Sequence, residues 1–373
     1  MSPLRVLLAG TLLLLVLVPA SCLLDGFGRQ DVTVLVDAGK DADEPDVVLC
    51  AHKTPPSVPA DAQPGNGADF VVAIRSIDMR EGQGAEPIGY DLDKTCSCQG
   101  ELASCREPGK KPICDGTDGI DNQASKIFRL IQGGAGGPEK FGSAFFSDAA
   151  NNGVWSILMR VRGYNGLADD DAVEFDWYPP AGTGKGADGG APAWDGNDTW
   201  PVSTSGLEDG MTVELPKFRN IHAYVSNHVL VASLPSSAFS MGGSGQGGVT
   251  IKLTGGMVTA TIVEGDAGGY ALRDGVIAAR WSLADVFAAL SSFRDDNGDP
   301  ICKGTVTYNF GKSTICSSAD ILTAAGGPSD PCDALSFGFG FTADPATLGA
   351  PIDPIQPAKF CPDGGDPLGD TCN

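Results

Sequence analysis

The sequence predicts a mostly β protein, an antiparallel β-sandwich of the jelly-roll or lectin-like type with a few short helices and a disulfide-rich insertion. Three observations favour this fold class: short runs in which apolar and polar residues alternate, many turn-forming residues, and little helical periodicity. The chain holds 51 glycines and 26 prolines, and its apolar share of 42% is enough for a core. No long internal repeat is evident, which disfavours propellers and solenoids.

Alternating runs predict short strands along most of the chain. Residues 155–162 alternate apolar and mostly polar side chains, as a half-buried strand does. Residues 221–234 predict a hairpin that turns at 226–228. The pair Gly255-Gly256 stands between two further alternating runs and predicts a second tight hairpin.

A further strand is predicted where three phenylalanines alternate with glycines. Phe337, Phe339 and Phe341 place their rings on one face of this strand. The other face carries Gly338 and Gly340, which have no side chain beyond the α-carbon. We therefore expect the backbone of a neighbouring segment to approach this face closely.

Three segments show the spacing of apolar residues that is typical of helices. The first, 124–131, has Asp121 or Asn122 as its cap, and the second begins at Ser282 with a sequence that resembles a capping box. The third lies near 313–325. All three apolar stripes are expected to face the core.

The N-terminus has the three parts of a signal peptide in residues 1–21, with a basic start, an apolar run and small residues before Cys22. The apolar run is shorter than the roughly 20 residues of a spanning helix. We expect lipidation of Cys22, followed by a tether over 22–35; ordinary cleavage after Ala20 is the alternative. Leu23, and not aspartate, follows the cysteine, which by analogy with lipoprotein sorting in other bacteria suggests the outer membrane; a secreted protein is the alternative.

The chain has eleven cysteines, and ten of them can pair once Cys22 carries lipid. Paired cysteines require an oxidising compartment, which agrees with export. We expect a β-sandwich domain over 36–350 with a cysteine-rich insertion at 94–123, and a tail at 351–373 that disulfides fasten. The connectivity stays open among Cys50, Cys96, Cys98, Cys105, Cys114, Cys302, Cys316, Cys332, Cys361 and Cys372.

The formal net charge of −22 argues against a nucleic-acid partner, because it repels phosphate. Clustered acidic residues also suggest a divalent cation. Asp91 and Asp93 lie on one side of an extended segment, and Asp115, Asp118 and Asp121 follow in a glycine-broken loop. Calcium takes six to eight oxygen ligands on flexible backbone, so these five residues are its candidate ligands. The alternative is a set of polar turns with Asp121 as a helix cap.

Four of the five tryptophans are close in sequence: Trp155, Trp177, Trp194 and Trp200. Several aspartates are interspersed among them. Aromatic faces stack on sugar rings while acidic groups bond the hydroxyls, so this mixture suggests a glycan-binding surface. The alternative is that these tryptophans are core residues.

Evidence for catalysis is weak. Glu174-Phe175-Asp176 is similar to the Glu-x-Asp core of some β-sandwich glycosidases, but the further glutamate of those enzymes is missing. Without it, the two-carboxylate mechanism has no identified pair. The sequence also contains no Gly-x-Ser-x-Gly elbow. An enzymatic activity is therefore left open, and a protein without one is favoured.

Several stretches resemble a family of uncharacterised secreted lipoproteins of predatory soil bacteria. They are residues 88–93 with the cysteines that follow, 114–122, 152–155 and 162–166. The resemblance implies export and a shared fold, and the family has no assigned activity.

Together these observations predict a cell-envelope lipoprotein held on the membrane by its lipid. It would act as a non-catalytic binding module for a glycan or surface polymer, with structural calcium. The alternatives are a purely structural or adhesive protein, and a glycoside hydrolase that uses Glu174 and Asp176.

Overall fold

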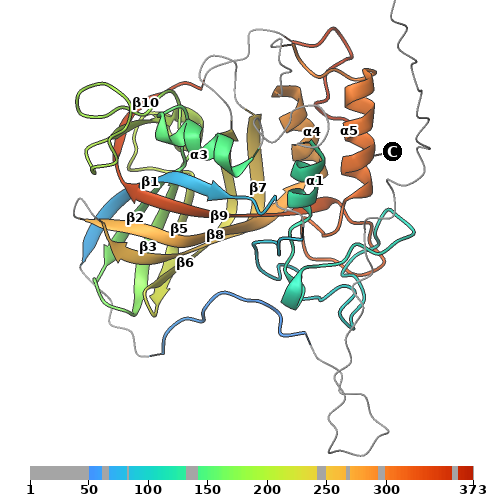
Figure 1. The fold of residues 1–373 in the computed structure, drawn as a ribbon, viewed down its shortest axis with the longest axis horizontal. Coiled ribbons are helices and arrows are strands. Elements are labelled where there is room, and N and C mark those ends of the chain that lie inside the picture. The colour runs from blue at the N-terminus through green and yellow to red at the C-terminus, as the bar shows by residue number, and fades with distance from the viewer. Residues whose placement is uncertain are drawn as a thin grey trace, which may run out of the picture. The chain divides into compact units, whose positions relative to one another are not determined.

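One sheet dominates the structure, a computed structural model that describes residues 50–60, 67–81, 84–131, 142–241, 249–265, 269–292, 299–354 and 360–372. Its eight strands are antiparallel, and the last pairs with the first, so the sheet closes into a barrel (Figure 1). In spatial order they are β1 (Ala68–Asp78), β2 (Leu158–Tyr164), β3 (Asp170–Tyr178), β5 (Phe218–Ser226), β6 (Val229–Met241), β7 (Val249–Glu264), β8 (Tyr270–Ser282) and β9 (Ala334–Pro345). The predicted mostly β, antiparallel class is confirmed. The sandwich is not, because one closed sheet takes the place of two packed ones.

Aromatic side chains fill the barrel. On β3, Phe175 and Trp177 are completely buried and belong to the main core, while Glu174 and Asp176, which alternate with them, point to the outer face. Trp177 and Phe337 both pack against Phe239, each with ring centroids 6.2 Å apart. An eight-stranded barrel is just wide enough for side chains to fill. Its interior is therefore a packed core, and the groove described below lies on the outer surface.

The two predicted hairpins have different outcomes. Strands β5 and β6 are joined by Asn227 and His228, which both have positive φ, as the central residues of a type I′ turn require. The predicted turn at Gly255-Gly256 is wrong, because β7 continues through it. The register with β8 shifts between Thr254 and Met257, and Gly255 has a φ of 54°, so the glycines form a bulge.

Two helices begin where the sequence predicts. Helix α1 (Gln123–Ile131) follows Asn122, whose Oδ1 accepts a hydrogen bond from the Ser125 amide at 3.1 Å, so Asn122 is the cap. Helix α4 (Leu283–Ser292) follows Ser282, whose hydroxyl accepts from the Asp285 amide at 3.1 Å. The Ser282 hydroxyl also donates to the Asp285 carboxylate at 2.6 Å, so Asp285 bonds the side chain of the cap residue and not its backbone amide, which the acid of a capping box would bond.

The other two helices depart from the prediction. Helix α5 spans Val306–Ser317, so the helix expected near 313–325 is wrong beyond its first turn. Its start is fixed by Thr305, whose hydroxyl accepts from the Tyr308 amide at 3.2 Å. Helix α3 (Ser143–Asn151) was not predicted, and it packs against β1.

A second layer covers the outer face of β1, β2 and β3. The short strands β4 (Thr199–Ser203) and β10 (Thr347–Ile352) pair in parallel there. They bury a small second core whose largest members are Tyr178 and Trp200. Trp200 is thus removed from solvent although it lies outside the barrel.

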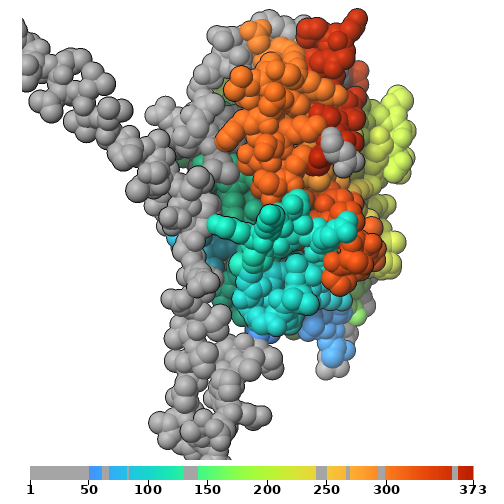
Figure 2. All heavy atoms as spheres, turned by 90° about the vertical axis from the view of Figure 1, so that its right-hand side faces the viewer, coloured from blue at the N-terminus to red at the C-terminus, as the bar shows by residue number. Residues whose placement is uncertain are grey.

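Five disulfides use all ten of the predicted cysteines. The pairs are Cys50–Cys96, Cys98–Cys114, Cys105–Cys332, Cys302–Cys361 and Cys316–Cys372. The last two fasten the C-terminal tail to α5 and the loop before it. The third ties the cysteine-rich insertion to the segment before β9, and Figure 2 shows the insertion, in cyan, against the part of the chain that holds α4 and α5.

Residues 88–122, which include most of the cysteine-rich insertion and are called the cysteine-rich segment from here on, dock on β9 through the predicted glycine face. A Cβ atom at Gly338 would lie 2.4 Å from the backbone oxygen of Ile88, so only glycine permits this approach. The Asn122 side-chain amide donates to both backbone oxygens, at 2.7 Å to Ile88 and 2.9 Å to Gly338. The helix cap of α1 is therefore also the joint between this segment and the barrel.

The predicted signal peptide 1–21, the lipidation site Cys22 and the tether 22–35 lie outside the described residues, and they stay predictions. Residues Leu49–Asn373 form one compact unit. Among the described residues, no helix has both the length and the hydrophobicity needed to cross a membrane.

Candidate functional site

Three of the four tryptophans proposed to bind a ligand are core residues. Trp155 is 2% exposed, and Trp177 and Trp200 are completely buried. The indole N–H of Trp155 donates to the Phe146 carbonyl, and that of Trp177 to the Ala238 carbonyl, both at 2.8 Å. No ring face of these three reaches solvent, so the ligand surface predicted from them does not form. Large aromatic rings contribute most to stability when buried, which is the alternative stated above.

Trp194 is the one of the four that stays half-buried at the surface. Its backbone has a φ of 58°, which is unusual for a bulky residue. Buried Asp198 holds this conformation by accepting from the amides of Ala193 at 2.8 Å and Trp194 at 2.6 Å. The Arg75 guanidinium lies 5.4 Å from the Trp194 ring centroid, within the range of a cation–π contact.

Three of the five predicted calcium ligands converge. One carboxylate oxygen from each of Asp91, Asp93 and Asp121 lies within 4.8 Å of the other two. Backbone amides orient them: Lys94 donates to Asp91 at 2.6 Å, Thr95 to Asp93 at 3.0 Å, and Leu92 to Asp121 at 2.7 Å. Two oxygens bound to one calcium at 2.3–2.6 Å can be at most about 5 Å apart, so this spacing fits a shared ion.

Asp115 lies in the same electrostatic environment, and Asp118 does not join the three. Asp115 accepts from the Ser97 amide at 2.6 Å, and burial raises its pKa to about 8, with further contributions from Asp93, Asp320 and Asp91. Asp118 is in a short 3₁₀ turn, where its backbone oxygen accepts from Lys53 at 2.7 Å.

Asp320 is a member of the cluster that the sequence did not indicate. Its carboxylate accepts from the Ser336 amide at 2.8 Å, and burial raises its pKa to about 7. It enters the cluster because the Cys105–Cys332 disulfide and an isolated bridge between Ile321 and Ala334 fold its segment back. More than 190 residues separate it from Asp121, so no local pattern could have indicated it.

The cluster has more negative than positive groups. Burial, then the charges of Asp93 and Asp115, raises the pKa of Asp121 well above its ordinary value. Lys126 is nearby, but its amine donates to the Cys114 carbonyl at 3.2 Å and burial lowers its pKa. His52 contacts Asp91, with 2.6 Å between Nδ1 and the carboxylate. In the described part of the chain, Asp93, Asp115 and Asp121 have no lysine or arginine within 4.0 Å.

The glycosidase alternative finds no open pair of carboxylates. Asp176 is completely buried, and Arg162 donates to it through Nε at 2.8 Å. Glu174 accepts from Arg219 at 2.5 Å. A buried carboxylate that is paired with arginine cannot reach a glycosidic bond, so these two residues form a structural charge network on the outer face of β3.

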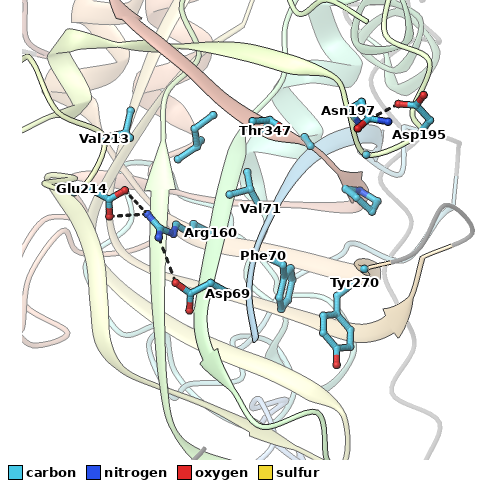
Figure 3. Close-up of a pocket in the computed structure, with 15 residues that line it drawn as sticks. Asp69, Phe70, Val71, Arg160, Asp195, Asn197, Val213, Glu214, Tyr270 and Thr347 are labelled. Atoms are coloured by element: carbon cyan, nitrogen blue, oxygen red, sulfur yellow. Dashed lines mark hydrogen bonds and ion pairs between the residues drawn. The ribbon is translucent and has the colours of Figure 1, made fainter. Parts of the chain in front are cut away.

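A surface groove of about 660 Å³ lies beside the first residues of β1 and β8, the last residue of β9 and Arg160 of β2. Figure 3 shows Glu214, Arg160 and Asp69 along one side of it, and Asp195 and Asn197 on the other. Arg160 donates to both oxygens of Glu214, at 2.8 and 2.9 Å, and contacts Asp69 at 3.3 Å. The sequence did not indicate this groove, because its lining comes from six separate parts of the chain.

Aromatic residues line one end of the groove. Tyr270 is half-buried, and its ring centroid lies 5.0 Å from that of Phe70 and 5.2 Å from that of Tyr164. Phe70 is largely covered, at 9% exposure, so Tyr270 is the more exposed of these two lining residues.

Comparison with known proteins gives no assignment: no family model, curated protein or solved structure matches this chain.

Proposed function

We propose that this protein is a cell-envelope lipoprotein, anchored through Cys22, that acts as a non-catalytic binding module for a glycan or surface polymer and uses calcium for structure. The observation that carries the proposal is the convergence of Asp91, Asp93 and Asp121 within 4.8 Å, in a segment that disulfides hold. Calcium would supply positive charge there, and no chemical step depends on it.

The charge of the cluster supports a cation. Several buried or half-buried carboxylates face each other with no arginine among them. Leaving such groups ionised and unpaired is costly, so they must either hold protons or bind a cation. At neutral pH and the millimolar calcium typical outside cells, a site of oxygen ligands is expected to take the ion, since extracellular calcium modules bind at about 0.1–1 mM.

The frame around the cluster supports a role outside the cell. Cys50–Cys96 closes a loop that contains Asp91 and Asp93, and Cys98–Cys114 ends one residue before Asp115, so the segments that carry these carboxylates are cross-linked before any ion binds. Pre-organised ligands lose less conformational entropy on binding. Disulfides of this kind form in the oxidising environment that the predicted signal peptide implies.

Calcium titration by isothermal calorimetry at pH 7.5 tests the cation. Wild type should bind one calcium, and Asp121→Asn should weaken that binding at least about tenfold, because one ligand charge is lost. Asp171→Asn is the matched control: Asp171 is exposed and lies outside the cluster, so this variant should bind as wild type does. The absence of calcium heat in wild type at millimolar concentration would refute the site.

A glycan array, probed with and without chelator, tests the binding function. The proposal expects signal on at least one glycan class and a weaker signal in chelator. Silence on every class in calcium would count against a glycan-binding module and favour a purely structural envelope protein.

A further inference from the structure

We infer that the groove between Glu214, Tyr270 and Asn197 is the ligand site and that it takes a neutral saccharide chain. This inference rests on the proposed binding function, but not on the calcium site, which involves other residues. The groove volume of about 660 Å³ is within the range of small-molecule sites, roughly 300–1,000 Å³. It is open along the surface, so a chain can pass through it.

The charges of the groove favour a neutral ligand. Three carboxylates line it, from Asp69, Asp195 and Glu214, against the single guanidinium of Arg160. Because Arg160, the one basic residue among the described residues that line the groove, already bonds Glu214 and Asp69, this lining offers no free cation to neutralise an acidic sugar. An anionic polymer would therefore meet net negative charge. Sugar hydroxyls, in contrast, can donate to these carboxylates.

The polar groups on the opposite side are suited to hydroxyls. The Asp195 carboxylate accepts from the Asn197 amide at 3.0 Å, and this turn exposes the Asn197 side chain to solvent. Among the described residues, the Asn197 side-chain amide has no hydrogen-bond partner. It can therefore donate to one sugar hydroxyl and accept from another.

Tyr270 supplies an aromatic platform at the end of the groove. Phe70 and Tyr164 pack against its ring and restrict its motion, so little conformational entropy is lost when a sugar stacks on it. One end of the groove thus offers a ring face, and the walls offer acceptors and an amide. This combination recognises the apolar face and the hydroxyl edge of a pyranose together.

The backbone around the groove is held in place without a ligand. Asp69 accepts from the Gly163 amide at 3.1 Å, and the Ala346 amide donates to the Val71 carbonyl at 3.0 Å. Thr347 donates through its amide to the Asp198 carbonyl at 2.8 Å. The walls are therefore fixed by the fold, and binding need not reorganise them.

Calorimetry of the full-length protein in calcium tests the inference. The probes are the hexasaccharides of β-1,4-linked glucose and of β-1,4-linked N-acetylglucosamine, with polygalacturonate as the anionic probe. Wild type should bind at least one neutral probe and not the anionic one. Tyr270→Ala should weaken binding at least about tenfold, and Asn197→Ala should weaken it several-fold. Tyr270→Phe, which keeps the ring, should stay within about threefold of wild type.

Two controls separate the inference from the proposed function. Phe310→Ala removes an exposed ring on α5, far from the groove in sequence and element, and should leave binding unchanged. Asn197 is exposed, so its variant should fold even if Tyr270→Ala does not. Unchanged binding in Asn197→Ala, with any folded Tyr270→Ala also unchanged, would place the site elsewhere and overturn the inference alone. Failure of wild type to bind any probe would overturn both, and preference for polygalacturonate would overturn the neutral ligand.

Discussion

The charged neighbours of buried carboxylates differ in sign between the barrel and the cysteine-rich segment. In the barrel, Asp176 is completely buried, and it is neutralised by Arg162, with Arg219 3.5 Å away and the Tyr178 hydroxyl as a further donor. In the cysteine-rich segment, Asp121 is 2% exposed and has other carboxylates as its charged neighbours. The barrel therefore carries its own counter-charges, whereas the segment depends on protons or a cation from solution.

This difference matches how each region is held together. The barrel has a large apolar core and closed strand pairing, and the stability that these provide offsets the cost of desolvating a buried ion pair. The segment from Ile88 to Asn122 has little regular structure, and three disulfides and the joint at Gly338 fix it. Its stability should thus respond to redox state, calcium and pH more than that of the barrel.

The largest effect is expected from removing the cross-link between the two regions. The double variant Cys105→Ser/Cys332→Ser opens a disulfide with a sequence separation of 227. It should lower the free energy of unfolding by about 4–5 kcal/mol, as measured by guanidinium denaturation without reductant. The Cys302–Cys361 disulfide closes a shorter loop, of separation 59, so its removal in Cys302→Ser/Cys361→Ser should cost about 1 kcal/mol less. A loss below 1 kcal/mol for the first pair would mean that the barrel holds the segment unaided.

The next largest effect is expected at the neutralised carboxylate of the barrel. Asp176→Asn leaves Arg162 without its buried partner and should lower the free energy of unfolding by about 3 kcal/mol. Calcium should not change this loss, because the site is remote from the cysteine-rich segment. Urea denaturation with calcium and with chelator measures both points, and a calcium-dependent loss would contradict the separation of the two regions.

A smaller effect is expected at the joint. Gly338→Ala would place a Cβ atom 2.4 Å from the Ile88 backbone oxygen, so a backbone must move, at a cost of about 2 kcal/mol. Gly340→Ala is the matched control, since its nearest neighbour at 2.9 Å is the flexible end of the Ile88 side chain. The melting temperature should fall clearly more for the first variant. Equal shifts would mean that the segment is not docked through this face.

The smallest effect has the opposite sign. In chelator at pH 8, Asp121→Asn removes a repelled charge while keeping an acceptor for the Leu92 amide. It should raise the free energy of unfolding by about 1 kcal/mol, in contrast to the loss for Asp176→Asn. Thermal unfolding of both variants in one buffer shows the contrast, and destabilisation by Asp121→Asn in chelator would show that its charge is already neutralised within the protein.

Local patterns predicted those parts of the fold that depend on neighbouring residues. The cap at Asn122, the side-chain cap at Ser282 and the turn before β6 are all set by a few consecutive side chains. The turn predicted at Gly255-Gly256 is wrong because glycine is as common in bulges as in tight turns. Only the pairing with β6 and β8 distinguishes the two structures. The burial of Trp177 could have been inferred, because Phe175 and Trp177 alternate with two acids on β3.

Non-local contacts account for the rest. Trp200 is buried by a layer whose partner strand, β10, lies almost 150 residues away in sequence. Asp320 is brought toward the carboxylate cluster by a bridge to the start of β9 and by a disulfide whose pairing the sequence left open. The groove is likewise an assembly of distant parts, and none of its residues has a local signature. A single sequence without the fold cannot indicate such sites.

The most direct test of the central claim is the free energy of unfolding between pH 4 and 8.5, measured in chelator and in 5 mM calcium. Burial raises the pKa of Asp115 from 3.8 to about 8, so the folded protein holds more protons than the unfolded chain in this window. In chelator, stability should therefore fall as pH rises from about 4 to 8, and calcium should abolish most of that fall while having little effect at pH 5. Identical curves with calcium and with chelator would contradict a cation in the carboxylate cluster.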